Sequence, residues 1–497
     1  MNEAVDVVVS ADRYAIAAFI GYLAILIGIG VYSSRFSSQG ISEYFIGGRK
    51  MNRFVVALSA VVSGRSAWLL LGVTGMAYAR GPSAIWAVVG YIVVEVFLFL
   101  YYAKRLRKFT EAFNCITVPD FFAERFGDAD GRLRMTIVVI FLVFMVGYVS
   151  AQFDAGGKAF ASGFGISTTS GILLTAAIVV VYTILGGFLA VSLTDTIQAF
   201  FMILALVIVP AIAIANIGGL PEMLAILQEM DAIYVDPLAI TAGVAIGFLG
   251  IGLGSPGNPH ILARYMSIDD PAQLRVAAVV GTVWNVLMAW GAVFIGLAGR
   301  ATFPDVAMLP NSDTENLFPL LAQLHLHPAL FGVVLASIFA AIMSTADSQL
   351  LVAASSVVRD IYEKIIRKGE EIPQKKLVLY SRTVVLALVV AALLFGFLVE
   401  DLVFWLVLFA WAGLGASIGP TSILALYWRG TTRAGIFAGL ITGTAVTILW
   451  YLTPLLREAL YELIPGFIAA LLATWLVSLA TKPTAASLKA YDSMKER

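Results

Sequence analysis

The feature that most constrains this chain is a long series of apolar stretches separated by short polar loops. A helix needs about 20 apolar residues to cross a bilayer. Of the residues, 60% are apolar and 13% are charged, whereas a soluble domain carries roughly 25% charged residues. The sequence therefore predicts an all-α polytopic membrane protein with thirteen transmembrane helices. Their predicted bounds are 14–33, 54–79, 83–103, 135–160, 169–189, 191–216, 238–259, 276–299, 329–355, 378–399, 401–427, 434–453 and 464–481.

The distribution of Lys and Arg predicts how these segments are oriented. With the N-terminus outside, 26 Lys and Arg residues fall in cytoplasmic segments, five fall in outer segments, and Arg65 alone lies at membrane depth. Cytoplasmic loops of membrane proteins carry the excess of positive charge. We therefore expect a multi-pass protein of the cell membrane with its N-terminus outside and its C-terminus in the cytoplasm.

Composition and motifs exclude several function classes. Lys plus Arg and Asp plus Glu both number 32, so a nucleic-acid partner is not expected. The chain has one cysteine, Cys115, and three histidines, which excludes a disulfide framework. Because no nucleophile–base pair, metal cluster or phosphate loop is present, we expect no enzyme and no cofactor other than a coupling ion. The expected partners are a small-molecule solute and the lipid bilayer, with no obligate protein partner.

Two predicted segments are interrupted at their middle. Residues 63–68 read Ser-Gly-Arg-Ser-Ala-Trp, and residues 247–259 contain five glycines and two prolines. Such breaks free backbone carbonyls that need another partner, and secondary transporters bind their ligands at breaks near the midplane. The spacing predicts two groups of five helices within a single domain, 1–497. Its parts are a leading helix and loop (1–53), the first repeat (54–216), the second repeat (238–427), two C-terminal helices (428–481) and a cytoplasmic tail (482–497).

Polar residues inside the ninth predicted segment indicate a cation site. Ser344, Thr345 and Ser348 lie at helical spacings that share one face. Hydroxyls together with backbone carbonyls suit a hard cation, although Ser and Thr also bond back to their own helix.

Charged residues at membrane depth are candidates for coupling. Arg65 lies about 16 Å into its segment at about 1.5 Å per residue, and a guanidinium stays charged in a protein. Asp195 is either such a residue or a solvated cap at the start of a helix. The coupling or counter-ion candidates are Asp195, Asp347 and Asp154.

Five stretches resemble the sodium/solute symporter family, and within it the sodium/proline symporters. They are residues 43–49, 117–122, 186–196, 259–266 and 343–351, in the family's order along the chain. The resemblance implies a leucine-transporter-like inverted five-helix repeat with one helix before it and two after it.

The resemblance also implies binding residues. The candidate sodium ligands are Val62, Arg65, Ser66, Ala341, Ser344 and Thr345. The candidate solute-binding residues are Ser63, Trp68, Tyr148, Gln152, Ile251 and Ser255. The sodium/proline symporters have an aspartate where this chain has Gly64 and an uncharged residue where it has Arg65. They also have a tryptophan and a tyrosine at the positions of Ile251 and Ser255.

The expected function is sodium-coupled symport of a small organic solute, an amino acid such as proline or a small carboxylate, by alternating access. One alternative keeps the fold but makes transport sodium-independent or proton-coupled. In that alternative Arg65 is a built-in cation that faces Ser344 and Thr345, with Asp347 or Asp195 as its counter-ion. Another alternative is a membrane sensor that lacks its kinase domain, against which the fifteen-residue tail argues.

Overall fold

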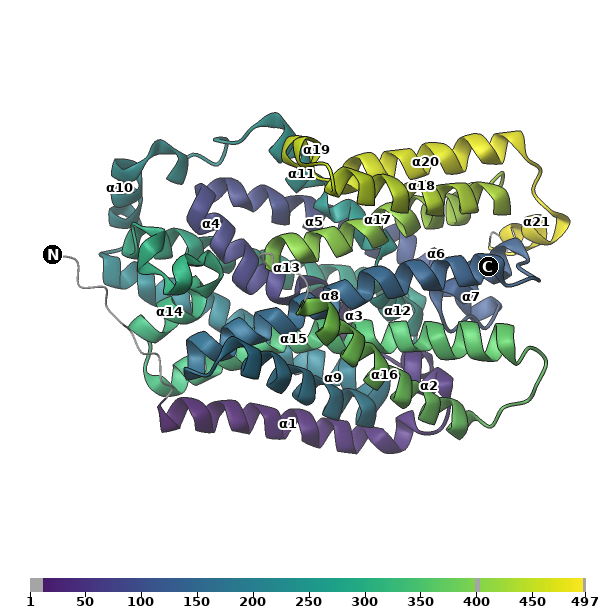
Figure 1. Cartoon of the computed structure of the whole chain (residues 1–497), viewed down its shortest axis with the longest axis horizontal. Helices are drawn as coiled ribbons and strands as arrows, with labels where there is room; N and C mark the ends of the chain where they lie inside the picture. Colours follow the sequence, from purple (N-terminus) through teal and green to yellow (C-terminus); the bar gives the residue numbers. More distant parts are fainter. Residues whose placement is uncertain (1–11, 398–402, 495–497) are drawn as a thin grey trace.

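A computed structural model describes residues 12–397 and 403–494, which form a bundle of long helices lying side by side (Figure 1). Within these residues the only β-type pairing is an isolated bridge between Met51 and Ile268. The long helices are α1 (Arg13–Ser37), α3 (Arg53–Ala67), α5 (Ile85–Phe97), α8 (Arg132–Phe164), α9 (Thr168–Ile217), α13 (Leu274–Thr302), α15 (Pro328–Ser355), α16 (Gln374–Gly396), α17 (Val403–Tyr427), α18 (Arg433–Tyr451) and α20 (Leu463–Ala480). The predicted helical membrane architecture is confirmed.

Shorter helices connect these elements. They are α2 (Ile41–Ile46), α4 (Thr74–Arg80), α6 (Ala103–Ala112), α7 (Val118–Phe126), α10 (Leu220–Met230), α11 (Ala242–Gly250), α12 (Pro259–Ser267), α14 (Leu317–His325), α19 (Pro454–Ala459) and α21 (Ala485–Asp492). Most of the predicted segments end within a few residues of the observed helices, but the helical stretches that contain 83–103 and 329–355 continue to Ala112 and Ile366. The end of the segment 378–399 and the start of 401–427 lie outside the described residues, as do 1–11 and 495–497.

By length and composition, ten stretches among the described residues could cross a membrane. Two of them are much longer than one crossing of about 30 Å requires at about 1.5 Å per residue. The stretch Arg53–Ala112 turns at Gly81 (φ 67°, ψ −155°). Helix α9 has 50 residues and is broken at Gly187 (φ 56°, ψ −157°), where a Cβ would lie 2.8 Å from the Tyr44 ring. Each stretch therefore holds two of the predicted segments.

The two predicted interruptions are present. In α3, Ser66 has φ 51° and ψ −169°, which is not a helical conformation. In the second repeat, α11 ends at Gly250, a 3₁₀ segment covers Ile251–Gly257, and α12 begins at Pro259. Helix α12 continues to Ser267, eight residues beyond the predicted end of that segment.

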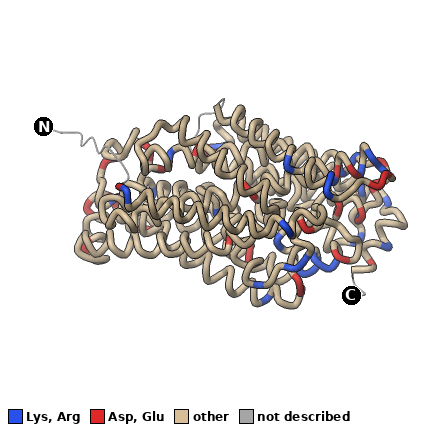
Figure 2. Tube along the Cα trace, turned by 90° about the horizontal axis from the view of Figure 1, so that it is seen from below, with Lys and Arg blue, Asp and Glu red and all other residues tan. Residues whose placement is uncertain are grey.

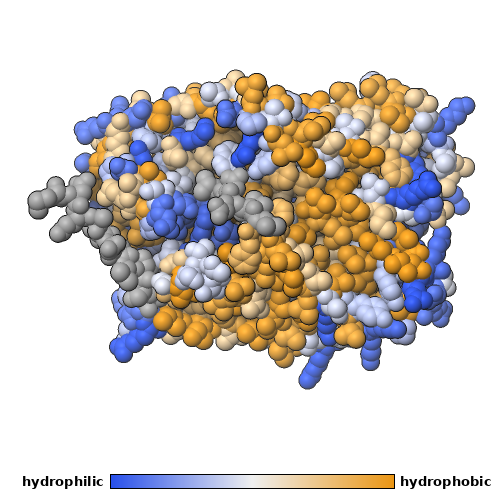
Figure 3. Space-filling view, in the orientation of Figure 1, coloured by the Kyte–Doolittle hydropathy of each residue, from blue (hydrophilic) through white to orange (hydrophobic). Residues whose placement is uncertain are grey.

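Charge and hydropathy are arranged as a bilayer requires. Most Lys, Arg, Asp and Glu residues gather near the two ends of the long helices, most densely at the end that carries the C-terminus (Figure 2). Apolar side chains cover much of the surface between the ends (Figure 3). In α16, for example, Leu379, Val390 and Leu394 are each more than half exposed, which is stable in lipid. The buried breaks therefore lie inside a lipid-facing bundle.

Candidate functional site

The break in α3 lies directly against α15. The Thr345 hydroxyl donates to the Ser63 carbonyl at 2.9 Å, and the Ser344 hydroxyl lies 3.5 Å from the Val62 carbonyl. Both hydroxyls also reach the Ala341 carbonyl, at 3.3 and 3.1 Å. All of these residues are fully buried. Three carbonyl and two hydroxyl oxygens therefore converge, which is the kind of ligand that a hard cation prefers.

The predicted sodium ligands are only partly brought together. Val62, Ala341, Ser344 and Thr345 meet as just described, but the Arg65 carbonyl accepts the backbone N–H of the first residue after α3. Ser63, predicted for the solute, contributes its carbonyl to the oxygen cluster instead.

The Ser66 hydroxyl turns toward the predicted solute residues. It accepts the Trp68 backbone N–H at 3.1 Å and lies 3.4 Å from the Tyr148 hydroxyl. Its hydroxyl therefore contacts two of the candidate solute residues, at the point where the backbone of α3 is not helical.

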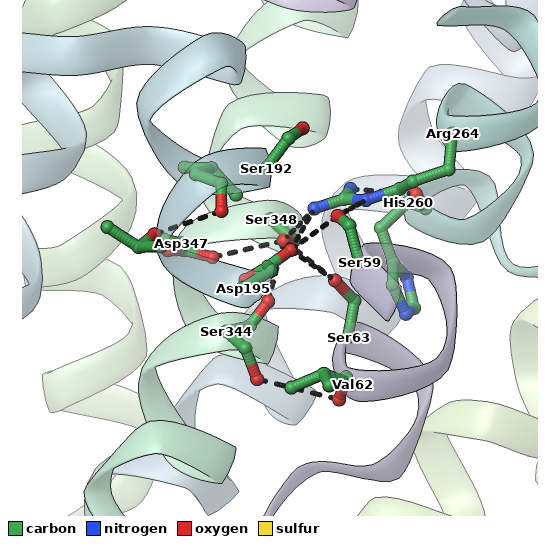
Figure 4. Close-up of polar contacts among 12 residues, drawn as sticks. Ser59, Val62, Ser63, Ser192, Asp195, His260, Arg264, Ser344, Asp347 and Ser348 are labelled. Carbon is green, nitrogen blue, oxygen red and sulfur yellow. Dashed lines mark hydrogen bonds and ion pairs between the residues drawn. The ribbon is translucent and has the colours of Figure 1, made fainter. Parts of the chain in front are cut away.

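Asp195 organises a buried polar network next to the oxygen cluster (Figure 4). Its Oδ2 accepts from the hydroxyls of Ser59 at 2.5 Å and Ser63 at 3.0 Å, and from Arg264 Nη2 at 3.2 Å. Arg264 also donates to the Ser348 hydroxyl and, through Nε, to Ser59 at 3.0 Å. Asp195 is 0% exposed, so the alternative of a solvated helix cap is wrong.

Asp347 extends the network on the other side of Ser348. Its Oδ2 accepts from the Tyr182 hydroxyl at 2.6 Å, and its Oδ1 accepts from the Ser348 hydroxyl at 3.0 Å. Arg264 forms an ion pair with Asp195 and donates to the Ser348 hydroxyl, which in turn donates to Asp347, so this network holds two carboxylates and one guanidinium. The excess of negative formal charge favours a cation beside these residues.

Arg65 does not face this network. Its Nη2 forms an ion pair with Glu95 Oε2 at 2.9 Å, and its Nε donates to Asn285 Oδ1 at 2.7 Å. The predicted pairing of Arg65 with Asp347 or Asp195 is therefore wrong, as is the expectation that its side chain faces the hydroxyls of α15. The physical reason is that α5 and α13 supply a carboxylate and an amide on the opposite side of α3.

The candidate solute residues flank the break. Gln152 Oε1 accepts the Ala67 backbone N–H at 3.1 Å, and the Trp68 ring stacks on Phe404 with the ring centroids 5.9 Å apart. The Ile251 carbonyl accepts from the Trp411 indole at 2.8 Å.

Asp154 lies elsewhere. Its carboxylate is 3.8 Å from Lys158, one turn further along α8. Among the described residues it forms no hydrogen bond or ion pair with the α3 break, so its predicted part in coupling finds no support there.

Sequence reasoning missed two charged residues of this region. Glu95 stands inside the apolar segment 83–103, and a carboxylate at that depth is itself a signal of function. The sequence places Arg264 in a cytoplasmic loop, because the segment 238–259 is predicted to end at residue 259. In the structure Arg264 is 1% exposed and reaches the α3 break.

A buried cluster of carbonyl and hydroxyl oxygens between a broken helix and a packed neighbour is the arrangement in which secondary transporters bind their ligands. The chain belongs to the sodium:solute symporter family, whose model matches residues 44–443. It is 37% identical to the osmoregulated proline transporter OpuE of Bacillus subtilis (strain 168), over 99% of this chain and 98% of that protein. It is 38% identical to a sodium/proline symporter of Staphylococcus aureus (strain JH9), over 97% of this chain and 96% of that protein.

Two solved structures share the fold. A substrate-bound, outward-open Na+-coupled sialic acid symporter covers 95% of this chain and 99% of its own, with a TM-score of 0.81 and 19% identity. A closed nucleobase-cation-symport-1 family transporter with bromovinylhydantoin bound covers 92% of this chain and 98% of its own, with a TM-score of 0.53 and 13% identity. The chain is thus a multi-pass membrane transporter and not an enzyme.

Proposed function

We propose that the protein is a secondary active transporter of the cell membrane that couples sodium entry to uptake of a small organic solute by alternating access. The observation that carries this proposal is the convergence of the Val62, Ser63 and Ala341 carbonyls with the Ser344 and Thr345 hydroxyls. Sodium suits such a set of oxygens. The relatives named for proline favour a small amino acid such as proline, with a small carboxylate as the second candidate.

The same proposal includes the predicted repeats and orientation. Residues 54–216 and 238–427 form two five-helix groups, supported by a break in the first helix of each group. The N-terminus lies outside and the C-terminus in the cytoplasm, supported by the density of charged residues at the C-terminal end (Figure 2) and by the positive-inside rule.

The pairing of Arg65 favours sodium over the sodium-independent alternative. That alternative required a guanidinium whose charge acts on the cation site. Glu95 neutralises this charge at 2.9 Å, and the side chain points away from α15. The repulsion that would exclude sodium is therefore largely cancelled.

The test is uptake by proteoliposomes with and without an inward sodium gradient, using a panel of amino acids and small monocarboxylates. We expect sodium-driven uptake in the wild type. Ser344→Ala and Thr345→Ala should each raise the sodium concentration for half-maximal uptake about tenfold, which corresponds to about 1.4 kcal/mol.

The matched control is Ser337→Ala. This buried hydroxyl of α15 donates to the Val334 carbonyl of its own helix at 2.7 Å, so sodium activation should not change. Uptake that needs no sodium, or sodium activation unchanged in both site variants, would contradict the proposal.

A further inference from the structure

The Arg65 guanidinium is held by two other side chains and keeps one nitrogen free. Nε donates to Asn285 Oδ1 at 2.7 Å, Nη2 donates to Glu95 Oε2 at 2.9 Å, and Asn285 Nδ2 in turn donates to Glu95 Oε2. Nη1 is buried and has no hydrogen-bond partner among residues 12–397 and 403–494, in a side chain that is 1% exposed. Because buried donors are nearly always bonded, this nitrogen indicates a ligand.

Two aromatic rings link the guanidinium to Ile251, one of the candidate solute residues. The carbon of its head group is 3.4 Å from the centroid of the Tyr91 ring, and that ring is 5.3 Å from the Trp411 ring. Trp411 donates to the Ile251 carbonyl at 2.8 Å. A continuous set of contacts therefore links Arg65 to the break between α11 and α12.

The backbone of Gly64 packs against Tyr91, the same residue that the Arg65 guanidinium contacts. A Cβ at this position would lie 2.3 Å from the Tyr91 hydroxyl and 3.2 Å from the Ile261 side chain. An aspartate, which the sodium/proline symporters have here, cannot fit beside this Tyr91. At this point of the break the chain therefore has the guanidinium of Arg65 and no carboxylate from residue 64.

We infer that Arg65 recognises the carboxylate of the solute through Nη1, and that Glu95 and Asn285 position it. A guanidinium forms charge-assisted hydrogen bonds with carboxylates. The inference rests on the proposed function and narrows its solute class. Because the Arg65–Glu95 pair is already neutral and the coupled sodium is assigned to the separate oxygen cluster beside Asp195 and Asp347, an amino acid brings its own positive charge next to its carboxylate, which a monocarboxylate does not. The solute is therefore a neutral zwitterion.

All members of the cluster are buried: Arg65 is 1% and Glu95 is 3% exposed. The described state is thus closed around the guanidinium. The solute reaches Nη1 only when the helices around the two breaks move apart, which is what alternating access requires.

The test measures inhibition of sodium-driven uptake of radiolabelled proline by three unlabelled compounds. Proline has both charges, prolinamide lacks the carboxylate, and cyclopentanecarboxylate lacks the amine. In the wild type, proline should inhibit at a lower concentration than either analogue. In the double variant Arg65→Met with Glu95→Gln, the affinity for proline should fall about tenfold to a hundredfold, the loss of one charged hydrogen bond. The affinity for prolinamide should stay within about twofold. The ratio of the affinity for proline to the affinity for prolinamide should therefore fall by about the same factor as the affinity for proline.

Two further variants separate recognition from a purely structural role. Arg65→Lys keeps the charge and should retain part of the preference for proline over prolinamide. The control replaces another buried pair, Lys158→Met with Glu315→Gln, whose groups are 2.7 Å apart on α8 and the segment before α14. That variant should keep the wild-type ratio.

The outcomes of this experiment test the proposed function and the inference about Arg65 separately. A wild type without sodium-driven uptake of any amino acid overturns the proposed function itself. If another amino acid is the preferred solute, the same comparison uses that amino acid and its amide. Sodium-driven uptake with an unchanged ratio in the Arg65 and Glu95 double variant overturns only the inference about Arg65.

Discussion

The Arg65 guanidinium of α3 and the Glu95 carboxylate of α5 are 2.9 Å apart inside the helix bundle, and almost no part of either side chain reaches the surface. Removing one partner of such a pair leaves an unpaired buried charge, which costs about 3–5 kcal/mol. We predict that Glu95→Ala lowers the free energy of unfolding by this amount in detergent. The double variant Arg65→Met with Glu95→Met should recover most of it. Losses that simply add in the double variant would show that the pair does not act as a unit.

Sodium should stabilise the folded protein. A ligand that binds only the native state adds about 2.7 kcal/mol at a hundredfold excess over its dissociation constant. We predict that sodium raises the thermal midpoint in detergent above that in choline at the same ionic strength. The gain should be lost in Thr345→Ala, whose hydroxyl joins the Ser63 and Ala341 carbonyls. An equal midpoint in both salts would argue against a sodium site there.

Asp195 and Arg264 should behave as a coupled pair. Their charged groups are 3.2 Å apart, and the same carboxylate oxygen accepts from Ser63, whose carbonyl belongs to the oxygen cluster. We predict that Asp195→Asn raises the half-saturating sodium concentration at least about tenfold, since it weakens a charged hydrogen bond worth about 1.5–3 kcal/mol. Arg264→Gln in the Asp195→Asn background should cost less than Arg264→Gln alone. Independent effects in sodium-activation curves would refute the coupling.

The close packing around Gly64 predicts that a second substitution can offset the effect of a first. A methyl group there would lie 2.3 Å from the Tyr91 hydroxyl, and overpacking costs about 1–3 kcal/mol. Gly64→Ala should therefore lower the unfolding midpoint, and Tyr91→Phe in the same chain should restore part of the loss. No rescue would mean that the helical backbone, and not the hydroxyl, excludes a side chain at this position.

Glu462, which precedes α20, should make stability depend on pH. Burial raises its pKa from 4.5 to about 7, although Arg457 opposes the shift. Because the native state holds the proton more tightly than the unfolded state, its contribution to stability is complete below about pH 4.5 and is lost as pH rises through about 7. Glu462→Gln should make the thermal midpoint depend less on pH between pH 5 and pH 7. The same substitution at Glu458, an exposed neighbour, should leave that dependence unchanged. An unchanged pH profile in Glu462→Gln would contradict this assignment.

The apolar segments and the helix breaks were readable from local sequence. The bilayer sets the length of each apolar segment, because a crossing needs about 20 apolar residues regardless of how the helices pack. The interruption at residues 63–68 was predicted from Gly64 and its polar neighbours, and Ser66 has the non-helical backbone there. The meeting of Ser344 and Thr345 with the α3 carbonyls followed from their spacing and from the family resemblance.

The partners of the charged residues were decided only by the tertiary structure. Arg65 could have paired with any carboxylate at its depth, and the choice of Glu95 over Asp347 depends on how α3 is rotated between α5 and α15. Arg264 reaches Asp195 because α12 continues beyond the predicted end of its segment. Helix rotation and the packing of segments 30 and 69 residues apart set these contacts, whereas hydropathy reports only that a segment is apolar. The sequence thus determined where the chain crosses the membrane and breaks, and the packing of the helices determined which charges meet.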